Sequence, residues 1–267
     1  MAKTMNSKLC LLLLIMLFQI AWPGVTVSET TSMSEDELEE FIKKVIRENP
    51  QLIYDTVNEH IITMRKVKAE KKISDQELGT MLSQRVEDTV HPHNPVMGRE
   101  NAPVTIIAYS DFNCHYCAKG DEMVRMLMDK YPDKLRFIFK NNPNQDNEQP
   151  NEAALAAMAA HKQGRFWEYH DLLFQASPDV NEKTMLLCAE MMMLNMEQFN
   201  KDRKSDEIRG WVKKDKADAK KLNLVKTPTF VINGVLVRGV LNEKNFASII
   251  ERLISEIKRL EKKSGVK

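Results

Sequence analysis

The stretch SDFNCHYCAKG, residues 110 to 120, places Cys114 and Cys117 only two residues apart. A pair at this spacing serves as half of a metal site, as a structural disulfide or as two reactive thiols. The run VTIIAYS, residues 104 to 110, is β-branched and apolar, which predicts a buried strand. After the pair, CAKGDEMVRMLMDKYP carries apolar residues at helical spacing. The cysteines are therefore predicted at a junction between a strand and a helix.

A thiol at the start of a helix lies near free backbone N–H groups and the positive end of the helix dipole. Both features stabilise an anion, so the pKa of the Cys114 thiol is predicted below that of a free cysteine. His115 and Tyr116 lie between the two cysteines and are predicted to tune the pair. A hydrogen-bond donor or positive charge near the Cys114 sulfur would stabilise the reduced form and make the disulfide more oxidising.

The first residues of the chain have the pattern of a secretory signal peptide. Lys3 and Lys8 precede the apolar run LCLLLLIMLFQI, and small residues near Ser28 suit cleavage there. The run is about a dozen residues long, whereas a membrane-spanning helix needs about 20, so an uncleaved anchor is the less favoured alternative. The signal predicts export to the periplasm, an oxidising compartment.

Cleavage near Ser28 would remove Cys10 and leave Cys114, Cys117 and Cys188. It would also change the formal net charge from +1 to −1, because two of 39 basic residues are lost against 38 acidic ones. A nearly neutral chain does not favour a nucleic-acid partner, which usually requires a strongly basic face.

The stretches SEDELEEFIKKVIREN and PQLIYDTVNEHIITMRKVKAEKK predict two amphipathic helices separated at Pro50, and residues 77 to 86 predict a shorter one. The apolar faces require a partner, which is either the main domain or a second copy of the chain. We favour the second copy and predict a homodimer. The residues predicted to hold it are Leu38, Phe41, Ile42, Val45, Ile53, Val57 and Ile61.

The rest of the chain predicts an α/β fold with a helical insertion. Residues 135 to 140 predict a second strand, and a long block of helices follows. The pattern then returns to strands in TPTFVINGVLVRGV, where Asn233-Gly234 is typical of a type I′ hairpin. A helix over residues 242 to 260 completes the order βα, β, helical block, ββ, α.

These features together resemble the DsbA family of thiol–disulfide oxidoreductases. The strand–CHYC–helix unit, the strand opening with Thr227-Pro228, the hairpin and the last helix resemble a thioredoxin fold with an inserted helical domain. Phrases such as NAPVT, FKNNP, QGRFWEYHDLL and TPTFVINGV resemble the branch with outer-membrane antigens and homodimeric periplasmic DsbA proteins. The implied parts are a signal peptide (1–28), an N-terminal helical dimerisation segment with linker (29–88), a thioredoxin-like domain (89–143 and 223–267) and the helical insertion (144–222).

The resemblance also implies the roles of site residues. Cys114 would be the exposed attacking thiol and Cys117 the buried second thiol, while Pro228 would be cis and Thr227 would offer backbone groups to a client peptide. Many members carry a buried Glu six residues before the first cysteine, paired with a Lys on the next strand. This chain has Ala108 there, whereas Lys140 matches the Lys, so proton transfer through a buried acid at that position is in doubt.

The activity implied is introduction, and also isomerisation, of disulfides in secreted client proteins, without a cofactor. The implied electron partner is a DsbB-type membrane oxidase, a DsbD-type reductant or both. Four alternatives remain open at this point: a monomeric oxidase, a non-catalytic surface antigen or chaperone, a structural disulfide, and a zinc site. The zinc site would draw further ligands from Cys188, His161 and His170, which lack a recognisable ligand spacing.

Overall fold

The computed structural model describes residues 34–70, 72–143 and 152–264. The predicted signal peptide lies outside these residues. The chain forms two compact units, Met1–Met64 and Arg65–Lys267. Within the described ranges, no helix combines the length and the apolar character required to cross a membrane.

The first unit contains two amphipathic helices with exposed apolar faces. Helix α2 (Glu35–Glu48) begins with a capping box, in which the Ser34 hydroxyl accepts from the Glu37 N–H and the Glu37 carboxylate accepts from the Ser34 N–H. Helix α3 (Pro50–Glu70) follows one residue later and extends past the first unit. The exposed apolar residues are Leu38, Phe41, Ile42, Val45, Ile46, Leu52, Ile53, Tyr54, Val57, Ile61, Ile62 and Met64. All seven residues proposed for dimerisation are among them.

The second unit is built on a five-stranded sheet with the order β1-β3-β2-β4-β5. The strands are β1 (Val96–Gly98), β2 (Val104–Ser110), β3 (Leu135–Asn141), β4 (Thr229–Ile232) and β5 (Val235–Arg238). Strands β2 and β3 are parallel and the other neighbours antiparallel. Strands β4 and β5 form the expected hairpin, since Asn233 and Gly234 have φ values of 44° and 85°, as a type I′ turn requires.

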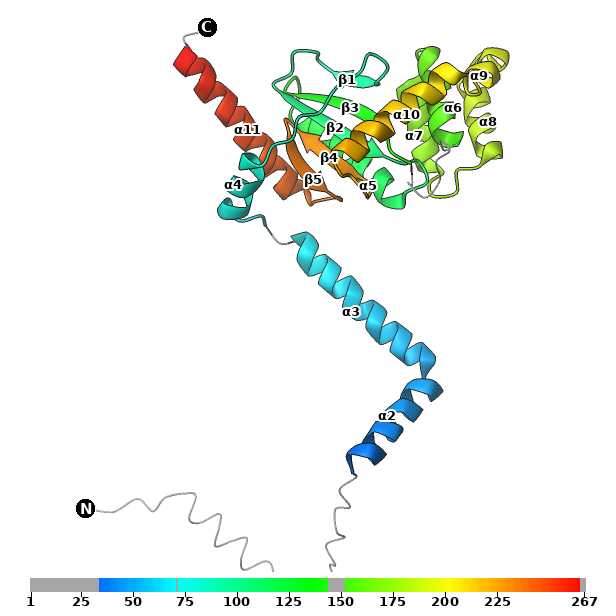
Figure 1. Cartoon of the computed structure of the whole chain (residues 1–267), viewed down its shortest axis with the longest axis vertical. Coiled ribbons are helices and arrows are strands. Elements are labelled where there is room, and N and C mark those ends of the chain that lie inside the picture. The colour runs from blue at the N-terminus through cyan, green and yellow to red at the C-terminus, as the bar shows by residue number, and fades with distance from the viewer. Residues whose placement is uncertain (1–33, 71, 144–151, 265–267) are drawn as a thin grey trace, which may run out of the picture. The chain divides into compact units, whose positions relative to one another are not determined.

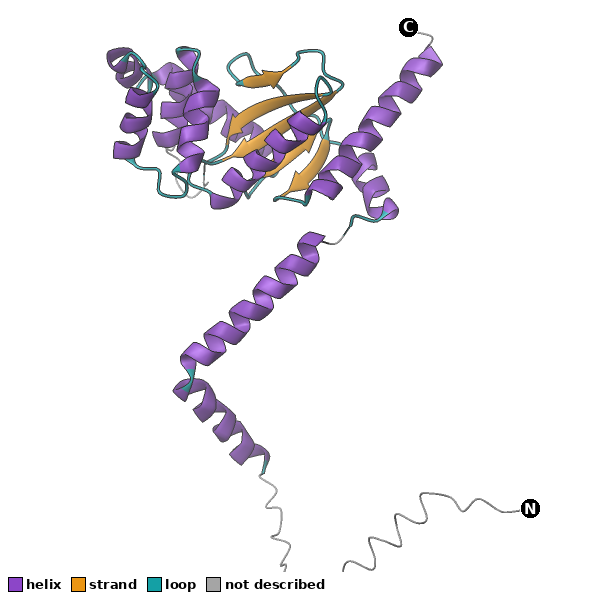
Figure 2. Ribbon diagram, turned by 180° about the vertical axis from the view of Figure 1, so that it is seen from behind, coloured by secondary structure: helices purple, strands orange, loops and turns teal. Residues whose placement is uncertain are grey.

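Helices cover both faces of this sheet. Alternate residues of β2 point to opposite faces, so Ile106 and Ala108 pack against α5 (His115–Lys130) and α11 (Glu243–Ser264), while Ile107 and Tyr109 lie toward α10 (Asp206–Lys221). Figure 1 shows α10 across one face, and Figure 2 shows the opposite face from behind. This is a thioredoxin-like fold, as the sequence predicted.

The helical insertion joins β3 to β4 and packs beside the sheet (Figure 1). It contains α6 (Glu152–Lys162), α7 (Phe166–Gln175), α8 (Glu182–Met191) and α9 (Met196–Asp202), and α10 leads back to the sheet. Its centre is α6, in which every residue from Ala153 to Ala160 is buried. Small alanine side chains let the neighbouring helices approach closely. Phe112 and Cys117 belong to the same apolar cluster, so the insertion also forms one wall of the cysteine region.

Helix α4 (Asp75–Ser83) packs on the second unit, although the sequence grouped it with the N-terminal helices. Leu78, Met81 and Leu82 pack against the core between the sheet and α11. The backbone N–H of Ile73 donates to the Asn245 side-chain oxygen at 2.8 Å. The thioredoxin-like unit therefore includes residues well before residue 89.

Candidate active site

The two cysteines lie at the junction of β2 and α5. Cys114 is the N-cap of α5 and is partly exposed, while Cys117 lies in the first turn and is 1% exposed. The Asp111 side chain shapes the preceding turn by accepting from the Asn113 N–H at 3.0 Å. Among the described residues, Cys114, Cys117 and Cys188 are free thiols. One sulfur of the pair is thus accessible and the other is protected.

The surroundings shift the pKa values of the two thiols in opposite directions. A hydrogen bond from the Cys117 thiol lowers the pKa of Cys114 to about 6, opposed by partial burial and assisted by Thr227 and by backbone N–H groups of the first helical turn. Burial raises the pKa of Cys117, and the Cys114 thiolate beside it raises that pKa further. The arrangement favours a thiolate at Cys114 and a protonated thiol at Cys117 at neutral pH.

The loop before β4 lies against the cysteines. The Thr227-Pro228 bond is cis, and the Thr227 carbonyl oxygen lies 3.6 Å from the Cys114 sulfur, as expected from the resemblance. Gly120 permits this packing, because a Cβ there would lie 3.3 Å from the Pro228 ring and 2.9 Å from the Phe230 ring. The sequence analysis did not single out Gly120. The sequence feature that could have indicated it is a glycine inside the predicted helix after the cysteines.

His115 and Tyr116 are both exposed on the first turn of α5, with their rings 5.8 Å apart. The Lys119 amine lies 5.9 Å from the Tyr116 ring centroid. Both side chains therefore face solvent beside Cys114. Their predicted tuning of the pair stays a prediction.

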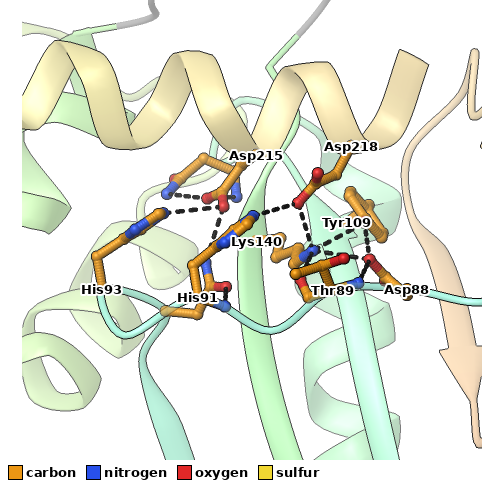
Figure 3. Close-up of polar contacts among 10 residues, drawn as sticks. Asp88, Thr89, His91, His93, Tyr109, Lys140, Asp215 and Asp218 are labelled. Atoms are coloured by element: carbon orange, nitrogen blue, oxygen red, sulfur yellow. Dashed lines mark hydrogen bonds and ion pairs between the residues drawn. The ribbon is translucent and has the colours of Figure 1, made fainter. Parts of the chain in front are cut away.

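Lys140 does not lie opposite Ala108, which changes the interpretation of this position. In the parallel pairing, Ala108 is in register with Phe139, whereas Lys140 is in register with Tyr109. Ala108 and Lys140 therefore point to opposite faces of the sheet. The Lys140 amine is bound by Asp88 and Asp218, each at 2.8 Å, on the face covered by α10 (Figure 3).

The polar contacts of Lys140 extend into a buried network that the sequence analysis missed (Figure 3). The amine also donates to the Thr89 carbonyl at 2.6 Å and to the Tyr109 hydroxyl at 3.1 Å. Asp218 contacts His91 at 2.7 Å. Burial raises the pKa of Asp218, but hydrogen bonds from Lys140 and His91 outweigh it and hold the pKa below its ordinary value.

Asp215 continues the network along α10 and is fully buried. Its carboxylate accepts from the Asn94 side chain at 2.8 Å and from the Asn141 N–H at 2.9 Å, and it lies 3.2 Å from His93. The network attaches residues 88 to 94 to the sheet and to α10. The sequence could have indicated that Asp215 is buried, because it falls on the same helical stripe as Val212 and Ala219.

The proposed zinc ligands are not brought together. Cys188 is buried in α8, and burial raises the pKa of its thiol. The His161 ring contacts the Phe166 and Trp211 rings. In the described part of the chain, the one group of three side chains close enough to share an ion is Asp121, His170 and Asp171, which includes neither Cys188 nor His161.

Comparison with known proteins identifies a family and a set of relatives. The family model described as Thioredoxin (Thioredoxin_4) matches residues 89–252. A Na⁺/H⁺ antiporter NhaA 3 from Salinispora tropica is 34% identical over 166 residues, covering 60% of this chain and 25% of that protein. The NhaA antiporter of Herminiimonas arsenicoxydans is 29% identical over 167 residues, with 62% and 27% covered. The chain spans about a quarter of the length of these curated relatives.

Solved structures resemble the thioredoxin-like unit and its insertion. A thioredoxin-like oxidoreductase from Silicibacter pomeroyi DSS-3 is 30% identical, with a TM-score of 0.57 and coverage of 62% of this chain and 94% of that one. Alpha-DsbA1 of Wolbachia pipientis shares the fold at 24% identity, with a TM-score of 0.56 and coverage of 64% and 96%.

ScsC of Proteus mirabilis shares the fold at 19% identity, with a TM-score of 0.52 and coverage of 83% of this chain and 97% of that one. The neighbours thus include DsbA-like thiol–disulfide oxidoreductases. Because the family match extends over more than half of the sequence and the sheet, the helices and the cysteine junction have the corresponding fold, the chain belongs to the thioredoxin family.

Proposed function

We propose that the chain is a thiol–disulfide oxidoreductase that acts on cysteine-containing proteins through Cys114 and Cys117. The observation that carries the proposal is an accessible, acidic thiol at the N-cap of α5, beside a buried thiol and 3.6 Å from the Thr227 carbonyl. A low thiol pKa stabilises the thiolate as a leaving group. The same stabilisation favours the reduced pair, which makes the oxidised pair an oxidant toward clients.

The reaction transfers two electrons from a client to the cysteine pair. A client thiolate attacks the Cys114 sulfur, the Cys114–Cys117 bond breaks, and Cys117 leaves as a thiolate that takes up a proton. The second client thiolate then attacks the client sulfur of the mixed disulfide. A disulfide forms in the client, and Cys114 leaves as a thiolate. Thr227 lies where its backbone carbonyl can accept from a client N–H during this exchange.

A reductive assay with matched cysteine variants tests this function. The mature chain should accelerate insulin precipitation by a dithiol and the oxidative refolding of a reduced client. Cys114→Ser should abolish both activities, because no attacking thiolate remains. Cys188→Ser is the control and should retain both, since Cys188 is 6% exposed in α8. If Cys114→Ser is as active as the unaltered chain, the pair is not catalytic, and the antigen or chaperone alternative gains support.

We further propose that the protein is exported and works in the periplasm, in the branch with outer-membrane antigens and homodimeric DsbA proteins. The N-terminal apolar run and its two lysines support export. Alkylation trapping of the cysteines in cells would identify the electron partner. A fully oxidised pair would indicate recharging by a DsbB-type oxidase, whereas a large reduced fraction would indicate a DsbD-type reductant.

Isomerisation by a homodimer is the finer proposal, and the exposed apolar faces of α2 and α3 support it. Phe41 is 55% exposed and Leu52 61%, and apolar faces of this extent require a partner. Two thioredoxin-like units held by such helices would keep a misfolded client near a reduced Cys114. Isomerisation begins when the Cys114 thiolate attacks a wrong client disulfide.

Deletion of residues 29–71 tests the dimer and keeps α4, which packs on the thioredoxin-like unit. The shortened chain should be a folded monomer that still oxidises dithiols but no longer reshuffles a scrambled client. Light scattering and a scrambled-client assay measure the two properties. A monomeric mature chain at micromolar concentration, or full isomerase activity after the deletion, would instead identify a monomeric oxidase.

A further inference from the structure

A fully buried imidazole lies between two carboxylates beside the cysteine helix. His170 of α7 has no exposed side-chain surface, and its Nδ1 lies 2.8 Å from Asp171 Oδ1. Its Nε2 lies 3.5 Å from Oδ1 of Asp121, which belongs to α5. Among the described residues, neither Nε2 nor this Asp121 oxygen has a hydrogen-bond partner. Two buried polar atoms therefore face each other without a hydrogen bond between them.

The geometry favours a proton between these atoms. Asp171 Oδ1 lies 2.6 Å from the Arg125 guanidinium and 2.8 Å from His170 Nδ1, a separation at which the ring nitrogen donates to the carboxylate. His170 Nε2 and Asp121 Oδ1 would then present two lone pairs to each other unless one of them is protonated. Burial raises the pKa of Asp121, against the opposing effects of His170 and Arg125. One proton held between Asp121 Oδ1 and His170 Nε2 would turn this contact into a hydrogen bond.

A metal ion fits this site less well than a proton. Arg125 lies against both carboxylates, at 2.6 Å from Asp171 and 3.5 Å from Asp121, so a dication would have to displace a guanidinium. The other surroundings are apolar rings. His170 contacts the rings of Phe112, Phe139, Phe166, Trp167 and Phe174.

The Asp121 carboxyl group lies on the same helix as the buried thiol of the pair. Asp121 follows Cys117 by four residues on α5, so the two side chains share one face of the helix with Cβ atoms about 6 Å apart. Phe112 and Phe139, which contact the His170 ring, also belong to the apolar cluster that contains Cys117. Asp121 is thus the acidic group one helical turn after the buried thiol, and it faces His170 of α7.

Of the three groups Asp121, His170 and Asp171, the last one reaches solvent. The Asp171 side chain is 45% exposed, whereas that of Asp121 is 12% exposed. Both carboxylates line a surface cavity of about 450 Å³, together with Ala118, Glu122, Arg125 and Gln175. A proton that reaches Asp171 can leave to bulk water.

We propose that Asp121, His170 and Asp171 form a proton relay between the buried Cys117 thiol and solvent. When Cys117 resolves a mixed disulfide on Cys114, the proton held between Asp121 and His170 moves to His170 Nε2, Asp121 takes up the Cys117 proton, and His170 Nδ1 releases its proton through Asp171 to solvent. The Cys117 thiolate attacks the Cys114 sulfur, the Cys114–Cys117 bond forms, and the partner leaves as a thiolate. When a client thiolate opens the disulfide, the same groups return a proton to Cys117.

Neither Ala108 nor Lys140 offers Cys117 an alternative proton acceptor. A methyl group at that position cannot exchange a proton, and Lys140 faces the opposite side of the sheet with its own carboxylates. The relay approaches Cys117 from α5 and α7 instead of from β2. This inference rests on the proposed thiol–disulfide exchange function.

A stopped-flow reaction of the reduced mature chain with a chromogenic aromatic disulfide measures the attack step and the resolution step separately. The first release of coloured thiolate reports attack by Cys114, and the second reports resolution by Cys117. Asp121→Asn should leave the first phase unchanged and slow the second about 100-fold at neutral pH, at the low end of general acid–base effects. Its second-phase rate should rise about tenfold per pH unit, because hydroxide must now remove the proton.

Asp129→Asn is the matched control, since it makes the same replacement at an exposed position of the same helix. If the second phase of Asp121→Asn stays within about twofold of this control, with the same pH profile, the relay is wrong. Should Asp121→Asn fail to fold, Asp171→Asn carries the test. It should slow the second phase about tenfold, and formate should restore the rate; an unchanged rate overturns the proposal. Absence of a fast first phase in the unaltered chain would instead contradict the proposed function itself.

Discussion

Replacing Lys140 by Met should destabilise the thioredoxin-like unit strongly. The Lys140 side chain is fully buried, and its two carboxylate partners are 3% exposed for Asp88 and 19% exposed for Asp218. Methionine preserves most of the volume but leaves both carboxylates without their cation. Removing one partner of a buried ion pair costs about 3–5 kcal/mol in the free energy of unfolding. For a unit of this size, that corresponds to a fall in Tm of about 6–20 °C.

Urea unfolding measures this loss, and Lys130→Met provides the control. Lys130 forms an even shorter ion pair with Glu243, at 2.6 Å, but the two side chains are 45% and 40% exposed. The control should lose less than about 1 kcal/mol. Combining Lys140→Met with Asp88→Asn should recover part of the loss, because one orphaned charge is removed. Equal losses for Lys140→Met and Lys130→Met would refute the assignment of Lys140 as the centre of a buried network.

The remaining predictions concern Cys114, a helix glycine and acid stability. The alkylation rate of Cys114 should increase about tenfold per pH unit below pH 6 and level off above it, because its pKa is lowered to about 6; a midpoint at or above about 8.5 contradicts this. Gly120→Ala should cost about 1–3 kcal/mol, because the new Cβ would lie 2.9 Å from the Phe230 ring. Gly210→Ala, which meets nothing within 4 Å, should instead stabilise the protein by about 0.5–1 kcal/mol in thermal unfolding. The fold lowers the pKa of Asp218, so the ionised carboxylate stabilises the folded state fully above the ordinary carboxyl pKa, and this stabilisation is lost as pH falls through the folded pKa. Asp218→Asn should therefore make the free energy of unfolding fall less steeply in acid. An unchanged pH profile of stability would contradict this.

The parts of the fold that local patterns determine could be predicted from the sequence. A β-branched run, a CxxC pair and a helical stripe follow one another directly, so the strand-to-helix junction at Cys114 needed no knowledge of distant contacts. The Asn233-Gly234 turn was equally local. The cis bond before Pro228 came only from the family resemblance, because the residues alone predict no more than a turn.

The buried polar groups could not be predicted in the same way. The partners of Lys140 come from a segment before β1 and from α10, and only the strand register shows which face of the sheet it occupies. His170 was treated as a candidate zinc ligand, because nothing in the sequence connects it to Asp121 on another helix. The position of α4 depends in the same way on side chains of β5 and α11, far along the chain.

The distance along the chain between the two halves of the cysteine site has a consequence for the order of folding. Cys114 and Cys117 are three residues apart, but the Thr227 carbonyl comes from a residue 113 positions after Cys114. Local contacts form before contacts that close long loops. A growing chain therefore contains both thiols long before it contains the loop that faces them. Any fragment that stops before residue 227 therefore carries both thiols without the carbonyl oxygen that lies beside the Cys114 sulfur.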